Sequence, residues 1–571
     1  MVTMTDNQYY LVCFLLLFLT TLLFQFIFNK LLKLKTHPQL PPSPPTLPRI
    51  LQAMVTMTDN QYYLVCFLLL FLTTLLFQFI FNKLLKLKTH PKLPPSPPTL
   101  PVIGHLHLIG PSFHKSLQKL STQYGPIFNL RLGFAQCIVV SSASVGTEIC
   151  KTHDLSFADH QEIAFSEKIP YGNSGFFSAP YGDYWRFIKK LCMTELLSTG
   201  QLERSRAVRE KELERFLQNV FESAKRKEVV DLGVELMKLT NNMLCKMAAS
   251  TSCSEKGDEA ERIREAMKDT FKVGSKIFFG NMLGPFGFLA FWLFGKQVIS
   301  TQQRIDELLE RMLKEHEDQI GKKDTQDFMD VLLKVYQDGK AEVKMTRNNI
   351  KAFLTDLFVG STGTTSEVIL WTITELINHP SVFNKVREEI NSVVGRTRLV
   401  DELDVENLPY LQAVVKEALR LYPPLPVTTR KCRQSCKIGG FEIPQETVVL
   451  INLYGIMRDP NLWTNPNEFQ PERFLVSSEK QESMKYKHDE MFTFLPFGAG
   501  RRACPGSKLG LSMAHMAVAT MVQCFNWEVV GDGGEGKAKV NTEVSKGAFI
   551  HKAHPLKCLP VVKFNPFDCV M

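Results

Sequence analysis

The 571-residue sequence contains few cysteines, no block of like charge and no paired zinc ligands. Its 13 cysteines are too sparse for a disulfide-stabilised scaffold. The 67 basic and 58 acidic residues nearly balance, and no basic arm points to a nucleic-acid partner. No His-x-x-x-His or Cys-x-x-Cys pair has the spacing of a zinc site. With 44% hydrophobic and 22% charged residues, the chain is expected to fold rather than remain disordered.

A nearly identical repeat occupies the N-terminus. Residues 1–48 recur at 54–101 with one difference, Gln39 against Lys92. Each copy contains an uncharged apolar run of 19 residues, Tyr10–Phe28 and Tyr63–Phe81, followed by lysines. At about 1.5 Å per residue, such a helix reaches roughly the 30 Å of a bilayer core.

The lysines after each run predict a signal anchor that leaves the rest of the chain in the cytosol. Two successive spans would strand one lysine cluster in the lumen. We therefore interpret residues 1–53 as a duplicated exon or a start-site error, with Met54 as the working start. A cleaved signal peptide is disfavoured, because the run is long, basic residues follow it and no small-residue cleavage site is apparent. We expect a single-pass anchor at 54–92.

A proline-rich stretch follows this predicted anchor. Pro94–Pro101 cannot continue a helix, so we expect an extended hinge over 93–108. Residues 109–571 then form the predicted catalytic domain, in which helical patterns dominate. Its apolar, uncharged segment Ile277–Phe294 is either buried core or a loop that dips into the membrane.

Several elements of this domain can be placed from the sequence. Strands are expected at Ile127–Leu132 and Cys137–Val140, and amphipathic surface helices within 201–256 and 299–337. One long helical pattern runs over Thr346–Asn378. Its middle, Gly360–Thr365, is rich in residues that weaken helices. We therefore predict a bend or bulge there that faces a bound group.

One cysteine lies in a glycine-rich loop before an apolar helix. The loop Phe497–Gly506 contains Cys504, with Arg501 and Arg502 nearby. A helix N-terminus and neighbouring cations both favour a thiolate, and a thiolate can serve as an axial ligand of haem iron. An ordinary buried cysteine is the alternative interpretation.

This loop resembles the haem-binding loop of the cytochromes P450, Phe-x-x-Gly-x-Arg-x-Cys-x-Gly. The fixed positions are occupied by Phe497, Gly500, Arg502, Cys504 and Gly506. The resemblance identifies Cys504 as the iron ligand. It implies a mainly α fold with a small β lobe behind an N-terminal transmembrane anchor.

Further motifs resemble the same family in the same order. Glu417 and Arg420 resemble its buried helix pair, and Arg473 the usual third partner of that pair. Trp185 and Lys189 resemble the residues that touch the haem propionates, with Lys189 in place of the commoner arginine. Arg430 resembles another propionate contact.

The resemblance also implies cofactors, partners and a location. We expect haem b (iron protoporphyrin IX), electrons from NADPH through a cytochrome P450 reductase, and a small apolar substrate. The expected location is the endoplasmic reticulum membrane, with the catalytic domain in the cytosol. Gly104–Leu108 and Ala553–Cys558 look most similar to a crucifer group that oxidises triterpenes, while flavonoid-oxidising relatives share much of the pattern.

The long helix departs from the family pattern at one position. Thr364 matches the threonine that aids proton delivery to dioxygen, but the acidic residue usual before it is Gly363. Water held by Ser361, Thr364 and the Gly363 backbone, or a hydroxyl of the substrate, would then carry the protons. The alternative is a haem- or sterol-binding membrane protein with weak or no turnover.

Overall fold

The computed structural model describes Thr73 and residues 93–569, except 101–102, 163–165, 170, 251–265, several positions between 267 and 286, 320–326, 476–491 and 531–538. The predicted repeat copy at 1–53 and, Thr73 apart, the predicted anchor at 54–92 lie outside these residues. In the described part of the chain, no helix combines the length and apolarity needed to cross a bilayer. The chain divides into compact units at 1–90 and 91–571, and the following description concerns the second.

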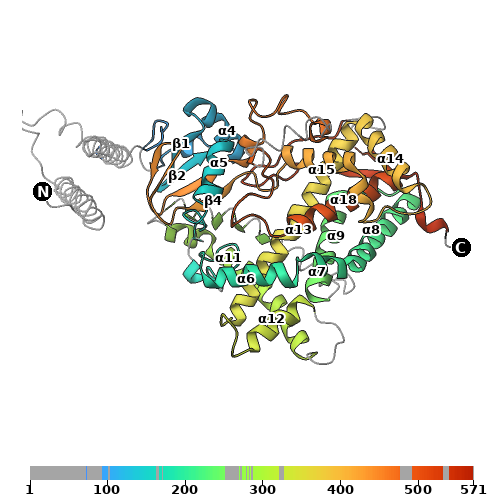
Figure 1. Cartoon of the computed structure of the whole chain (residues 1–571), viewed down its shortest axis with the longest axis horizontal. Coiled ribbons are helices and arrows are strands. Elements are labelled where there is room, and N and C mark those ends of the chain that lie inside the picture. Colours follow the sequence, from blue (N-terminus) through green and yellow to red (C-terminus); the bar gives the residue numbers. More distant parts are fainter. Residues whose placement is uncertain are drawn as a thin grey trace, which may run out of the picture. The chain divides into compact units, whose positions relative to one another are not determined.

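Helices make up most of this second unit (Figure 1). They are α4 (Phe113–Tyr124), α5 (Ala143–Thr147), α6 (Asp183–Glu195), α7 (Thr199–Arg204), α8 (Arg206–Arg226), α9 (Leu232–Ala249), α11 (Gly287–Glu317), α12 (Phe328–Gln337), α13 (Arg347–Asn378), α14 (Pro380–Val394), α15 (Pro409–Leu421), α16 (Leu453–Ile456) and α18 (Ser507–Cys524).

The described residues also form three small sheets. Their strands are β1 (Ile127–Leu132), β2 (Ala135–Val140), β3 (Val230–Asp231), β4 (Thr428–Lys431), β5 (Cys436–Ile438), β6 (Phe441–Ile443), β7 (Val448–Ile451), β8 (Phe525–Val529) and β9 (Lys557–Val562). The largest sheet has the order β1-β2-β7-β4, with β2 and β7 parallel and the other pairs antiparallel. The order of the second is β3-β9-β8, and β5 pairs with β6. The predicted mainly α fold with small sheets is confirmed.

Helix α13 runs through the main hydrophobic core. It starts after Thr346, whose side chain accepts from the Asn349 amide in a capping box, and it ends before His379. It packs against α9, α15 and α18, whose buried apolar side chains form the centre of that core. The predicted helix over Thr346–Asn378 is confirmed.

One expectation about burial was wrong. Helix α9 is largely buried instead of lying on the surface, because it packs against α8, α12 and α13. Of the two interpretations of Ile277–Phe294, buried core does not describe the first turns of α11, since Phe288, Trp292 and Leu293 are exposed. A pattern of charged and apolar residues predicted these helices, but their environment depends on which neighbours cover them.

Candidate active site

The loop before α18 is shaped by two glycines. Gly498 and Gly500 adopt φ angles of 68° and 73°, a region that favours glycine. A Cβ atom on Gly500 would lie 2.5 Å from Asp154 Oδ1, so a larger residue would not fit. The Cys504 amide donates to the Phe497 carbonyl oxygen at 2.9 Å and closes the loop. These contacts place Cys504 just before Ser507, the first residue of α18.

Cys504 is a free thiol with an accessible surface. The surrounding protein nevertheless desolvates the thiol and raises its pKa, against an opposing hydrogen bond from the Gly506 backbone. We expected Arg501 and Arg502 to favour the thiolate, but both guanidinium groups have other partners: Arg501 pairs with Asp154, and Arg502 donates to backbone carbonyl oxygens. A coordinated metal ion would remove the thiol proton directly, without help from the arginines.

Arg430 of β4 is a buried cation. It is 3% exposed, and its guanidinium donates to Thr428 Oγ1 and to the carbonyl oxygens of Thr429 and Ala499. None of these acceptors is a carboxylate, and desolvation lowers the pKa of Arg430. A buried charge that is not bonded to an opposite charge is destabilising, and an anion placed beside it would remove that penalty.

Arg502, Trp185 and Lys189 lie together. The Arg502 guanidinium lies 4.4 Å from the centroid of the Trp185 ring, and Lys189 Nζ lies 5.1 Å from it. Desolvation, together with the positive charge of Arg430, lowers the pKa of Arg502 to about 10. Desolvation also lowers the pKa of Lys189. Arg502 and Lys189 therefore form, around Trp185, one cationic group that is poorly solvated.

The polar hydrogens of this group point to backbone oxygens. Trp185 Nε1 donates to the Phe176 carbonyl oxygen at 3.0 Å, and Lys189 Nζ donates to the Arg501 carbonyl oxygen at 2.5 Å. Carbonyl oxygens are neutral acceptors, which an anionic ligand can replace or share.

The middle of α13 carries two hydroxyl groups on its accessible side. Thr364 Oγ1 donates to the Gly360 carbonyl oxygen at 2.6 Å, and Ser361 Oγ donates to that of Leu357 at 2.7 Å. We predicted a bend or a bulge here, and because the helix stays α-helical throughout, the bulge is absent. Bonds from a hydroxyl to the carbonyl four residues earlier can form inside a continuous helix, which explains the difference.

Gly363 lies away from this accessible side. It is buried, and its carbonyl oxygen accepts from Ser366 Oγ at 2.9 Å. Gly360 is exposed instead, and a Cβ atom there would meet nothing within 4 Å. On this part of α13, open space for water lies at Gly360.

Asp356 is a residue of α13 that our sequence analysis did not single out. Its Oδ2 accepts from the Phe177 amide at 2.9 Å. Burial raises the pKa of Asp356 to about 6, although hydrogen bonds from the Phe177 and Phe176 amides oppose the rise. Its spacing of four residues from Gly360 and eight from Thr364 places it on the same side of the helix, a signal that was available in the sequence.

Glu417, Arg420 and Arg473 meet as the sequence predicted. Glu417 and Arg420 are fully buried on α15 and share two hydrogen bonds of 2.8 Å. Arg473, in the turn Pro471–Phe474, donates to Glu417 Oε1 at 3.0 Å. Arg420 also donates to backbone carbonyl oxygens of the 457–468 segment, so the group ties α15 to the chain that leads toward the cysteine loop.

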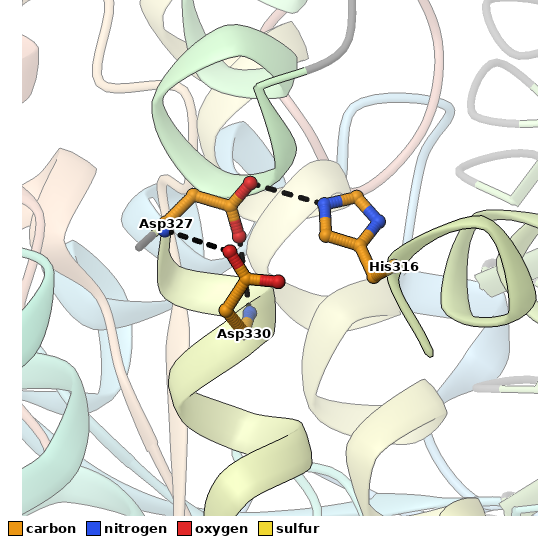
Figure 2. A group of neighbouring side chains, drawn as sticks. All are labelled: His316, Asp327 and Asp330. Atoms are coloured by element: carbon orange, nitrogen blue, oxygen red, sulfur yellow. Dashed lines mark hydrogen bonds and ion pairs between the residues drawn. The ribbon is translucent and has the colours of Figure 1, made fainter. Parts of the chain in front are cut away.

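A second polar cluster joins the end of α11 to the start of α12 (Figure 2). His316 Nε2 bonds to Asp327 Oδ2 at 3.0 Å, and Asp327 and Asp330 each accept from the other's amide. His316 Nδ1 bonds to the Met312 carbonyl oxygen. These bonds use His316 Nε2, both carboxylate oxygens of Asp327 and one of Asp330, so the cluster serves as a helix cap.

Comparison with known proteins identifies the family. Residues 94–550 match the sequence pattern described as Cytochrome P450. The chain belongs to the cytochrome P450 family. The predicted plant cytochrome P450 and its monooxygenase class are thereby confirmed.

The most similar plant relatives cover nearly the whole chain. Cytochrome P450 705A22 of Arabidopsis thaliana is 44% identical over 515 residues, covering 90% of this chain and 99% of that protein. Beta-amyrin 24-hydroxylase of Glycine max is 39% identical, covering 90% of this chain and 100% of that protein. 3,9-Dihydroxypterocarpan 6A-monooxygenase of Glycine max is 38% identical, with coverage of 89% and 99%.

A solved structure shares the fold. A zebra fish cytochrome P450 with abiraterone has a TM-score of 0.66 at 23% identity, covering 79% of this chain and 99% of that one. At this identity the likeness supports the cytochrome P450 fold alone.

The family implies haem, and the geometry of this cytochrome P450 fits such a group. The accessible thiol of Cys504 is a suitable iron ligand. The buried guanidinium of Arg430, which no carboxylate among the described residues bonds, is a suitable partner for a propionate. A buried cation of this kind is difficult to explain by folding alone, because burying its charge is unfavourable.

Proposed function

We propose that this cytochrome P450 hydroxylates an apolar plant secondary metabolite of the triterpenoid or another terpenoid class, using dioxygen and electrons from NADPH. The Cys504 loop carries this proposal, because it presents an accessible thiol beside a cationic cluster. Bound haem would supply the activation of dioxygen.

The protein's own residues would have three tasks. Cys504 would bind the iron, and Arg430, Arg502, Lys189 and Trp185 would hold the propionate side. Phe497, Gly500 and Gly506 would shape the loop around the sulfur. Ser361 and Thr364 of α13 would hold water, because their hydroxyl oxygens can accept hydrogen bonds from water while donating to α13 carbonyl oxygens.

The proposed electron donor is an NADPH–cytochrome P450 reductase on the endoplasmic reticulum. In the structure the basic side chains near the cysteine loop already have partners: Arg186 pairs with Asp183, and Lys190 lies 3.6 Å from Glu342. These pairs are exposed and therefore weak, so an acidic reductase could replace them. The predicted anchor at 54–92 would hold both proteins at one membrane.

The substrate class rests on relatives and stays a proposal. A relative named as a beta-amyrin hydroxylase supports a triterpenoid substrate. A relative named as a pterocarpan monooxygenase supports the alternative, a flavonoid-type substrate. Titrating the purified protein with a pentacyclic triterpene and with a pterocarpan would separate them, because a substrate that displaces water from iron shifts the Soret band.

The ligand assignment is tested by the carbon monoxide difference spectrum of the reduced protein, expressed from Met54 in microsomes. We expect a strongly red-shifted Soret band for the wild type, and its loss in Cys504→Ser. Cys192→Ser is a matched control, since Cys192 is buried on α6. A red-shifted band that persists in Cys504→Ser would contradict the assignment.

The same preparation tests the non-catalytic alternative. Gly363 favours this alternative because it provides no acidic side chain beside Thr364. A normal red-shifted band with no product from any terpenoid or flavonoid tested, and no NADPH consumption above the reductase alone, would support a haem- or sterol-binding role.

A further inference from the structure

Helix α13 presents one carboxyl group in line with Thr364. Asp356, Gly360 and Thr364 recur every four residues and so form one stripe along the helix. Along this stripe Asp356 is half-buried, Gly360 exposed and Thr364 half-buried, whereas Phe358, Thr362 and Thr365 on the opposite side of the helix are buried. Eight residues at about 1.5 Å each place Asp356 about 12 Å from Thr364 along the axis.

The gap between these two side chains is open in the middle. Gly360 has no side chain, and the space around its Cβ position is free of other atoms to 4 Å. Ser361 Oγ lies next to this gap and donates to the Leu357 carbonyl oxygen, which leaves its lone pairs free to accept. Three or four water molecules would therefore bridge the carboxyl group to Thr364, at roughly 3 Å per hydrogen bond.

The surroundings of Asp356 hold it in place without neutralising it. The segment before α6 supplies the Phe177 amide, and Gly175 approaches so closely that a Cβ atom there would collide with Asp356 Oδ2. The titratable group that faces it from α6 is Tyr184, whose hydroxyl donates to the Ser174 carbonyl oxygen. Among the described residues, no lysine or arginine shifts the pKa of Asp356.

We propose that Asp356 is the proton-relay residue of this enzyme, taking protons from solvent and passing them along the accessible stripe of α13 to Thr364. This role rests on the function proposed above. The overall reaction is RH + O2 + 2 H⁺ + 2 e⁻ → ROH + H2O, with the electrons from NADPH through the reductase. Each proton that leaves the Asp356 carboxyl group is replaced from water, so the residue itself is unchanged.

The ionisation of Asp356 suits this role. Burial raises its pKa to about 6, so both protonation states are populated near neutral pH. A proton relay is most effective when its pKa lies near the working pH. An ordinary exposed aspartate, with a pKa of about 3.9, would hold a proton far less often.

A purely structural role is the competing explanation, because Asp356 also anchors the loop at Phe177. Asp356→Asn separates the two roles, since an amide oxygen still accepts from the Phe177 amide but no longer titrates. Glu389→Gln is the matched control. Glu389 of α14 likewise accepts two backbone amides, from Tyr410 and Leu411, and burial likewise raises its pKa.

The first measurement is product formed per NADPH consumed, in full-length enzyme with reductase. We expect Asp356→Asn to lower this ratio about tenfold or more, with peroxide released instead, and Glu389→Gln to leave it within about twofold. The carbon monoxide spectrum is recorded for each variant. If the wild type has no red-shifted band, the proposed function is refuted. If every variant has the band, a change in coupling is due to proton delivery and not to loss of the haem site.

The second measurement does not depend on turnover. Infrared difference spectra of the resting protein between pH 5 and 8 should contain a protonated carboxyl band that disappears near pH 6. That component should be missing from Asp356→Asn and retained in Glu389→Gln. An unchanged titration in Asp356→Asn would overturn the proposal, even if the variant were poorly active.

A conservative variant completes the test. Asp356→Glu keeps a titrating carboxyl group, so it should retain more of the coupling than Asp356→Asn. A loop-anchoring role, which the amide oxygen of asparagine can fill, predicts instead that Asp356→Asn retains at least as much coupling as the longer glutamate. Wild-type coupling in Asp356→Asn, or coupling in Asp356→Glu no higher than in Asp356→Asn, would each overturn the relay.

Discussion

Around the candidate site, the residues expected to affect folding stability most are buried and charged. Arg420 is 0% exposed, yet Glu417 neutralises it with two hydrogen bonds. Arg473 adds a third charge to the same carboxylate. Removing one member of such a group leaves a buried charge without its partner, which is more destabilising than the net stability of the intact group suggests.

Glu417→Gln should therefore lower the free energy of unfolding by about 3–5 kcal/mol, because Arg420 and Arg473 would both lose their carboxylate partner. The midpoint of urea denaturation, followed by far-UV circular dichroism, measures this loss. Glu222→Gln is the control, since the exposed Glu222–Lys225 pair should contribute little to stability. Equal shifts in the two variants would contradict the account.

Residue patterns alone located most of these side chains. The Glu417–Arg420 spacing and the fixed positions around Cys504 were evident in the sequence, because both depend on local geometry in one helix or one loop. Asp356 and the orientation of Arg502 were not predicted. Both depend on the segment 175–179, which meets them from elsewhere in the chain.

At the scale of elements, the end of a helix can also depend on a residue from a neighbouring helix. Asp327 caps α12, and His316 from the last turns of α11 bonds to the same carboxylate (Figure 2). Burial would raise the pKa of Asp327, but the hydrogen bonds from His316 and the Asp330 amide outweigh it, so the pKa lies below its usual value. A depressed pKa means that ionised Asp327 stabilises the fold.

Asp327→Ala should destabilise the protein by about 1–2 kcal/mol at pH 7, through loss of the cap. Because the folded-state pKa is lowered, this contribution is complete above the unfolded value near 4 and disappears as the pH falls through the folded value. Denaturation midpoints between pH 3 and 7 measure it. Asp327→Asn, which keeps a capping oxygen, should retain part of the stability and lose its dependence on pH; an unchanged dependence would count against the His316 interaction.

At the scale of the whole molecule, one exposed apolar surface stands out on the described residues. The start of α11 exposes Phe288, Leu289, Trp292 and Leu293, and Trp292 is 79% exposed. Apolar groups so close together are unusual on a protein that meets only water. We propose that these four residues contact the bilayer that the predicted anchor at 54–92 enters.

Full-length protein in vesicles that contain brominated lipid tests this contact. Lipid bromine should quench part of the tryptophan emission of the wild type, and Trp292→Phe should remove that part. Trp463→Phe is the control, because Trp463 lies against Arg420 and Arg473. Quenching that is the same in wild type and Trp292→Phe would show that this surface does not meet lipid.

The sequence by itself determined the family, the long helix α13, the strand pair β1–β2 and the cysteine loop. Each depends on periodicity or on residues within a few positions of one another, which the chain order preserves. Tertiary structure decided that α9 is buried, that Gly360 and not Gly363 borders the accessible side of α13, and that the segment around Gly175 and Phe177 covers Asp356. Burial and electrostatic environment come from neighbours distant in sequence, and only the packed chain brings those neighbours together.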